Sequence, residues 1–157
     1  MAVMYTALLV LHSWLRWVVI FSGVAALGGA VGGLTARRAW LPVDNLRSLI
    51  FTISLDVQVL IGLLLYGVLS PVTQSGFADM GLTMRDSVLR FFVVEHLFGM
   101  LVALVLAHVG RVRLRKASDA TRRHKSVLVF LGLALAVLLL SIPWPGMPAG
   151  RVLFRGF

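Results

Sequence analysis

The sequence predicts an all-α integral membrane protein, in which four transmembrane helices form an antiparallel bundle. Of its 157 residues, 59% are hydrophobic and only 13% are charged, whereas soluble domains have about 25% charged residues. The mean hydropathy is +0.95. Four apolar runs each approach the roughly 20 residues that cross a hydrocarbon core. Because lipid offers the backbone no hydrogen bonds, each run is expected to be helical.

The first expected span covers residues 5–34. No basic segment precedes its apolar run, so we expect a retained helix and not a cleaved signal peptide. Small-xxx-small patterns near its inner end let helix backbones approach closely in lipid, and they are formed by Gly28, Gly29, Gly32 and Gly33. These patterns favour packing within the bundle, with a homodimer contact as the alternative.

The second and third spans are expected at residues 46–69 and 88–112. The connection between them is long enough for a short surface helix or a lid. The fourth span, 126–142, has no charged residue, and we expect it to be a lipid-facing wall. Prolines on either side of Trp144 end it, and the indole suits the membrane interface. Short connections make neighbouring helices antiparallel, so we expect residues 1–157 to form a single membrane domain.

The net charge of +9 predicts the orientation. Ten of the 15 cations lie in two connections, at Arg37, Arg38, Arg47, Arg111, Arg113, Arg115, Lys116, Arg122, Arg123 and Lys125. The positive-inside rule places these connections, including a basic loop over 111–125, in the cytoplasm, so both termini are predicted to lie outside it. Because the charge follows the topology, we expect the lipid bilayer as a partner and no nucleic acid.

The residue types that are absent exclude several kinds of chemistry. Without cysteine the chain has no disulfide, no thiolate metal site and no covalent haem attachment. It also has no Ser-His-Asp spacing, no H-E-x-x-H and no glycine-rich phosphate loop, so nothing indicates hydrolysis. Whether the protein is an enzyme stays open at this stage.

Five ionisable residues lie deep within the expected spans, where each costs at least ~2.5 kcal/mol: His12, Arg16, Asp56, Glu95 and His96. At ~1.5 Å per residue, His12 lies roughly 10 Å and His96 roughly 12–13 Å below the outer edge. Two imidazoles at one level on different helices are what a six-coordinate haem b requires. From spacing alone, the alternative is that both histidines simply bond to neighbouring helices.

The helix faces beside these histidines also allow a cofactor. Gly99 and Ala103 follow His96 on one stripe, so their small side chains leave room for a flat macrocycle, and Gly99 is a candidate cofactor-binding residue. Arg16 lies one turn from His12 and is a candidate partner for a haem propionate or a buried carboxylate.

The other polar residues admit several interpretations. Asp56 and Glu95 bracket Arg16 in depth, so one or both are expected to neutralise it. Alternatively, Glu95 accepts a hydrogen bond from the ring of His12. Gln58, Gly62 and Tyr66 share one face, which suits either a quinone headgroup or interhelical hydrogen bonds.

Two further histidines are not expected to bind a metal. His108 has no histidine partner at its depth and is expected to be an interfacial residue. His124 lies in the basic sequence RRHK and is expected to be a solvated loop residue.

Five blocks of sequence are spread over all four spans: LHSWLRW (11–17), QVLIGLLLY (58–66), DSVLRFFVVEH (86–96), RRHK (122–125) and SIPWP (141–145). As a group they resemble a family of small bacterial four-helix membrane proteins labelled cytochrome b or cytochrome b-like. The resemblance implies a bacterial inner-membrane protein in haem b or quinone-linked electron transfer, with His12 and His96 as the ligands. One position departs from it, because Asp56 stands where we expect relatives to carry histidine.

The sequence leaves competing hypotheses for function. The first is an electron-transfer protein that binds one haem b between the first and third helices and exchanges electrons with a quinone. The second is a non-catalytic accessory or assembly subunit of a larger respiratory or photosynthetic membrane complex, without haem. A proton-conducting module ranks last, because the spans offer almost no polar side chain below Asp56.

Overall fold

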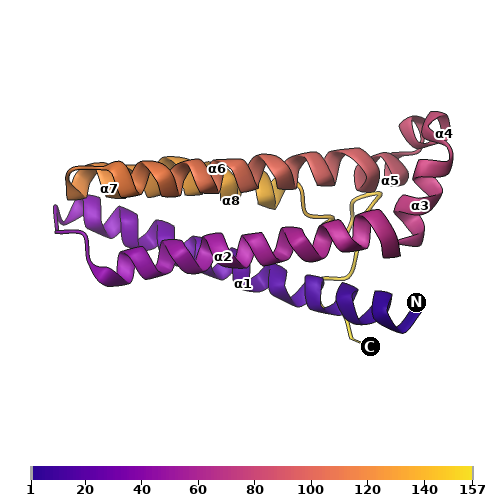
Figure 1. The fold of residues 1–157 in the computed structure, drawn as a ribbon, viewed down its shortest axis with the longest axis horizontal. Helices are drawn as coiled ribbons and strands as arrows, with labels where there is room; N and C mark the ends of the chain where they lie inside the picture. Colours follow the sequence, from indigo (N-terminus) through magenta and orange to yellow (C-terminus); the bar gives the residue numbers. More distant parts are fainter. Residues whose placement is uncertain (1, 157) are drawn as a thin grey trace.

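The computed structural model describes residues 2–156, and within this range the chain is helical and has no strand. Four helices are long and apolar enough to cross a membrane: Ala2–Thr35, Pro42–Leu69, Ser87–Lys116 and Ala120–Leu140. They lie along the long axis of the molecule, and each runs opposite to the one before it (Figure 1). The prediction of an all-α protein with four helices long and apolar enough to span a membrane is confirmed.

Three of these four helices contain a short π-helical turn, labelled η. The elements in chain order are α1 (Ala2–Thr35), α2 (Pro42–Leu64), η1 (Leu65–Leu69), α3 (Pro71–Ala78), α4 (Met80–Arg85), α5 (Ser87–Arg90), η2 (Phe91–Glu95), α6 (His96–Lys116), α7 (Ala120–Ser126), η3 (Val127–Leu131) and α8 (Gly132–Leu140). Both ends of the chain lie toward the end of the bundle that carries α3 and α4 (Figure 1).

The predicted basic loop over 111–125 is mostly helical. The helix α6 continues through Lys116, and α7 begins at Ala120, so only three residues make the turn. Arginine and lysine are good helix formers, which lets both helices extend past their apolar segments. Asp119 starts α7 by accepting a hydrogen bond of 2.8 Å from the backbone N–H of Arg122.

The connection between the second and third spans forms the two short helices α3 and α4, as one of the two alternatives predicted. It is tied to the end of the second span by side chains. Thr73 Oγ1 donates to the Tyr66 carbonyl at 2.7 Å, and Gln74 Nε2 donates to the Gly67 carbonyl at 2.9 Å. The last carbonyls of a helix lack helical donors, so these side chains satisfy them.

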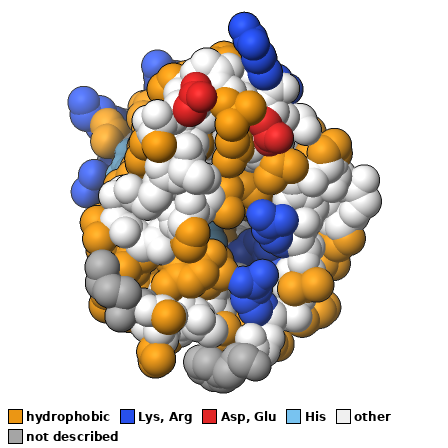
Figure 2. Space-filling view, turned by 90° about the vertical axis from the view of Figure 1, so that its right-hand side faces the viewer, with side chains coloured by type: hydrophobic (Ala, Val, Ile, Leu, Met, Phe, Trp, Pro, Cys, Tyr) orange, Lys and Arg blue, Asp and Glu red, His pale blue; other side chains and the backbone are white. Residues whose placement is uncertain are grey.

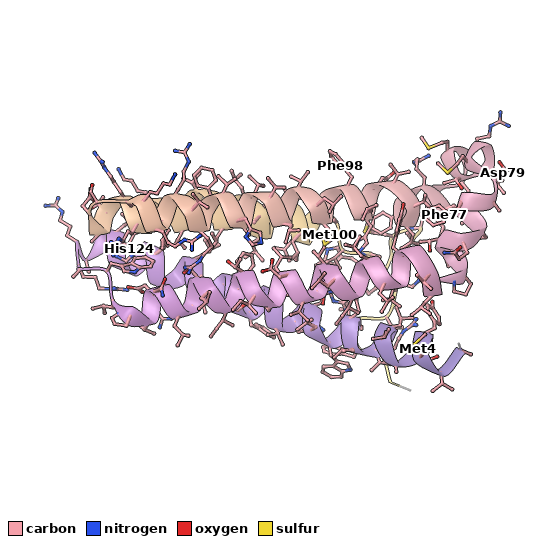
Figure 3. The ribbon with its side chains drawn as sticks, viewed as in Figure 1. Met4, Phe77, Asp79, Phe98, Met100 and His124 are labelled. Carbon is pink, nitrogen blue, oxygen red and sulfur yellow. The ribbon has the colours of Figure 1, made fainter. Side chains whose placement is uncertain are left out.

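The fourth span is part of the core and not only a lipid-facing wall. Leu131 and Ala134 are fully buried, whereas Leu140 is 80% exposed. Large apolar side chains point outward from the other spans too, as Figure 3 shows for Phe98. An outer surface of this kind suits a hydrocarbon solvent, in which apolar exposure carries no penalty.

His124 is buried, which corrects the expectation that it is solvated. Only 1% of its surface is exposed. Its ring lies at the inner side of the bundle (Figure 3), with its centre 5.0 Å from that of Trp40. A Cβ atom at Gly33 would overlap this ring. Because α7 begins before His124, the residue faces α1 and not solvent, and the missing side chain of Gly33 makes room for it.

The glycine patterns of the first span divide between two environments. Gly29 and Gly33 pack inside the molecule, against Arg47 and His124 respectively. Gly28 and Gly32 have open space where a side chain would lie. Packing within the bundle therefore accounts for half of the glycines.

The neighbours Gly33 and Gly32 give a matched test of this packing. Gly33→Ala is expected to lower the free energy of unfolding by about 1–3 kcal/mol, because the added methyl group overlaps the His124 ring. Gly32→Ala should leave it unchanged or raise it by up to about 1 kcal/mol, because alanine favours the helix. Thermal and denaturant unfolding in detergent measure both; equal effects would contradict the burial of His124.

Candidate functional site

The π-helical turn η2 sets the direction of His96. In such a turn the backbone bonds run from residue i to i+5, and the backbone N–H of His96 accordingly donates to the Phe91 carbonyl. The same spacing brings Arg90 and Glu95 onto one face, where Arg90 Nε lies 2.8 Å from Glu95 Oε1. Glu95 is thereby turned to the surface, with 49% of its side chain exposed.

The expectations for Glu95 and Asp56 were therefore wrong. Glu95 pairs with Arg90 and contacts neither Arg16 nor His12. Asp56 Oδ1 lies 2.8 Å from His108 Nε2, and both side chains are partly exposed on the outside of the bundle. Arg16 instead donates to a backbone carbonyl, that of Leu153.

The ring of His96 is held by the end of the fourth span. Its Nδ1 lies 2.7 Å from the carbonyl oxygen of Ser141. A carbonyl only accepts hydrogen bonds, so Nδ1 carries the proton and Nε2 keeps a free lone pair. Metal-binding histidines typically have one ring nitrogen fixed in this way.

Two prolines make this carbonyl available. In a continuing helix, the Ser141 carbonyl would accept from residue 145 and the Leu139 carbonyl from residue 143. Both positions are proline, which has no N–H. The His96 ring takes the first carbonyl, and the Trp144 indole takes the second at 2.8 Å.

Gly99, predicted as a cofactor-binding residue, is not among the residues that line the cavity between the histidines. A Cβ atom at this position would overlap the Ser141 side chain. The absence of a side chain lets the end of α8 approach α6, so Gly99 supports the His96–Ser141 bond indirectly. Below His96, the cavity wall is formed by Met100 and not by bare backbone.

His12 is held from α2. Gln58 Nε2 donates to the backbone carbonyl of His12 at 3.0 Å. Gly62 lies beside the ring, and a Cβ atom there would be 3.1 Å from His12 Cε1. The ring nitrogen Nδ1 is buried and has no hydrogen-bond partner among the described residues. Gln58 and Gly62, which were predicted to share one face of the second span, thus both contact His12.

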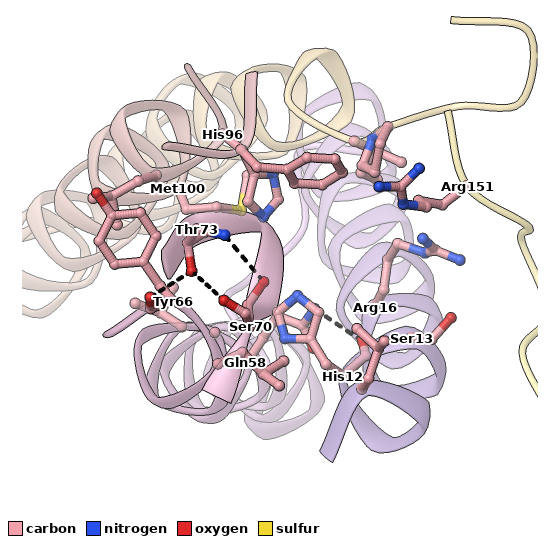
Figure 4. Close-up of a pocket in the computed structure, with 18 of the residues that line it drawn as sticks. His12, Ser13, Arg16, Gln58, Tyr66, Ser70, Thr73, His96, Met100 and Arg151 are labelled. Carbon is pink, nitrogen blue, oxygen red and sulfur yellow. Dashed lines mark hydrogen bonds between the residues drawn. The ribbon is translucent and has the colours of Figure 1, made fainter. Parts of the chain in front are cut away.

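The two imidazoles face one another across a cavity (Figure 4). Their ring centres are 6.5 Å apart, and their planes make an angle of 72°. Two imidazoles that share one metal ion through nitrogens at about 2.0–2.1 Å hold their centres about 6 Å apart. The donor set and its spacing therefore fit a bis-histidine haem. The same distance is also within the range of about 4.5–7 Å for edge-to-face aromatic pairs.

The cavity has a volume of about 190 Å³ and lies near the end of the bundle that carries the termini. Figure 2 looks at this end of the molecule, where arginine side chains lie next to a hollow between hydrophobic ones. The residues that line the cavity are mainly apolar. They include three that carry hydroxyl groups, Ser13, Tyr66 and Thr73. Pockets for drug-sized ligands measure about 300–1,000 Å³, so the cavity as it stands is smaller than these.

Three arginines also line the cavity: Arg16, Arg151 and Arg155. None of them forms an ion pair with a carboxylate within residues 2–156. Sequence reasoning identified Arg16 but missed the other two, because nothing in the local pattern shows that the segment after Pro145 folds back onto the bundle.

Comparisons of the chain with models of known protein families, with curated proteins and with solved structures found no match. Within the described part of the chain, no group of three or more His, Asp or Glu residues could hold a metal ion. A pair of histidines holds a metal stably where another group supplies the remaining ligands, as a porphyrin does.

The surface position of Glu95 can be tested separately. Glu95→Gln should change the free energy of unfolding by less than about 1 kcal/mol, because exposed ion pairs contribute little. Arg90→Gln removes the other partner and should have an effect of the same size. Denaturant unfolding in detergent measures both, and a loss of several kcal/mol in Glu95→Gln alone would indicate a buried partner instead.

Proposed function

We propose that this protein is a membrane-embedded, cytochrome b-like electron-transfer protein that binds one haem b through His12 and His96. The observation that carries the proposal is the pair of imidazoles, which face one cavity from α1 and α6 at 6.5 Å between ring centres. When bound, haem supplies reversible one-electron transfer. The resemblance of the five sequence blocks to cytochrome b-like proteins supports the same function.

The residues around the histidines have defined roles in this proposal. The Ser141 carbonyl fixes the tautomer and direction of the His96 ring. Gln58 ties α2 to α1 at the level of His12. Apolar residues such as Met100 and Leu138 line the part of the cavity next to the histidines.

The proposed redox partner is a quinone or quinol in the bilayer. Tyr66 and Thr73 line the cavity on the side away from Arg16 (Figure 4). Both of their hydroxyls donate to backbone carbonyls and keep lone pairs that accept hydrogen bonds. Such acceptors are suited to the hydroxyl groups of a quinol.

The proposed setting is a bacterial inner membrane, with both termini outside the cytoplasm. The basic residues between Arg111 and Lys125 gather at the end of the bundle opposite to the termini. The positive-inside rule favours the cytoplasm for that end. The candidate haem site then lies in the outer half of the membrane.

Haem binding is tested by a reduced-minus-oxidised absorption spectrum of the protein purified in detergent after expression with ample haem. We expect a haem b spectrum, its loss in His12→Ala and in His96→Ala, and its retention in His108→Ala. The last variant is the matched control, because His108 lies in the same span as His96 but is 54% exposed on the outside.

A colourless protein would contradict the proposal. It would favour the second candidate function, an accessory or assembly subunit of a larger membrane complex. The observation that favours this candidate is the ring geometry itself, because an edge-to-face pair of histidines also holds two helices together. Stoichiometric co-purification with a respiratory or photosynthetic complex would then identify its host.

The proposed orientation predicts the behaviour of fused reporters. A reporter that is active only in the cytoplasm should be active when inserted at Ser118, in the turn between α6 and α7, and silent at the C-terminus. A reporter that is active only outside the cytoplasm should show the reverse. Activity of the cytoplasmic reporter at the C-terminus would invert the assignment.

A further inference from the structure

The segment 143–156, here called the strap, folds back over the outer half of α1. Its path is the yellow coil that crosses the bundle in Figure 1. Trp14 Nε1 donates to the Arg155 carbonyl at 3.0 Å, and Trp17 Nε1 donates to the Leu153 carbonyl at 3.3 Å. Phe154 stacks on Trp17, with ring centres 5.3 Å apart and planes 10° apart.

The strap adds positive charge to a cavity that already holds Arg16. Arg16 is only 9% exposed, and its Nε has no hydrogen-bond partner among residues 2–156. Arg151 and Arg155 approach the same cavity from the strap. Figure 4 shows the guanidinium groups of Arg16 and Arg151 on the same side of the two imidazoles.

This arrangement calls for an anion. Burying the cation of Arg16 is costly unless it is paired, and no carboxylate of the described chain pairs with Arg16 or with the more exposed Arg151 and Arg155 beside it. A guanidinium fork matches a carboxylate with two parallel hydrogen bonds. The ligand that complements the cavity is therefore an apolar body that carries carboxylate groups at one edge.

The strap also limits the size of the cavity. Its residues Arg151, Val152 and Arg155 contribute to the lining of a space of only about 190 Å³. The first part of the strap is anchored, since Ala149 is buried and Trp144 packs on the core, but residues 151–156 rest on α1 only through three hydrogen bonds to strap carbonyls and the ring contacts of Phe154. These last residues can therefore shift without breaking the helical core.

We propose that the strap opens to admit the cofactor and closes on it, with Arg151, Arg155 and Arg16 binding the cofactor's carboxylates. This inference rests on the proposed function, because haem b is the carboxylate-bearing ligand concerned. It assigns the two propionate groups to the side of the cavity on which the arginines lie, and it makes the strap a part of the binding site.

The test compares haem b with its dimethyl ester, in which both propionates are uncharged. Titration of the purified apoprotein in detergent should give a Kd at least about tenfold higher for the ester than for haem b. A change of this size corresponds to the loss of at least one charge-assisted hydrogen bond. In Arg151→Gln this ratio should fall toward one. Arg122→Gln is the matched control, since its side chain is 73% exposed at the other end of the bundle.

Arg16→Gln provides a second variant, in case the apoprotein with Arg151→Gln unfolds. Equal affinity for haem b and its ester in the unaltered protein would overturn the role of the arginines while leaving the histidine ligands in place. Failure to bind either compound would overturn the proposed function itself. The two failures are thus distinguishable.

Movement of the strap has its own readout. The chain has no cysteine, so Val152→Cys offers a single site for a nitroxide label, at a residue that is 59% exposed. The label should lose mobility when haem b is added and lose less with the ester. Mobility that stays the same with haem b bound would overturn the closing of the strap.

Discussion

The site depends on one hydrogen bond between the third and fourth spans, from the His96 ring to the Ser141 carbonyl. Lipid offers no substitute partner for an unpaired carbonyl, so the end of α8 must be satisfied from within the protein. Pro145 removes the helical donor, and Gly99 removes the side chain that would keep α8 at a distance. The direction of the imidazole is thereby a by-product of how the fourth long apolar helix ends.

Charged side chains in the long helices cost free energy, and this protein lowers that cost in two different ways. Asp56 pairs with His108, and Glu95 pairs with Arg90, both at the outer surface of the bundle. The Arg90–Glu95 pair joins two opposite charges and is neutral as a unit. The arginines around the cavity have no carboxylate partner within the described residues, and the anion that would neutralise them is the one proposed above. This contrast separates the candidate site from the ion pairs on the outside of the bundle.

Counting residues from the helix ends was enough to predict that His12 and His96 lie at the same height in the bundle, because the rise per residue is nearly constant along an α-helix. The rotation of side chains was harder to predict. His96 and Gly99 both lie in the regular helix α6, but the end of the fourth span packs against Gly99 and takes the space that the stripe left open. The π-helical turn η2 changes the phase of the residues before His96 and turns Glu95 outward. The burial of His124 and the path of the strap depend on contacts across the bundle, with Gly33 and Trp17, that no local pattern contains.

The π-helical turn before His96 has a consequence for comparing related chains. One residue more or fewer in an α-helix rotates everything after it by about 100°. A homologue that lacks the extra residue of Phe91–Glu95 would keep the same hydropathy and the same histidine, yet would aim that imidazole at a different neighbour. In an alignment of related chains, a gap within residues 91–95 would therefore be more informative than the presence of His96. It would separate chains that have the same cavity from chains that have only the same helical bundle.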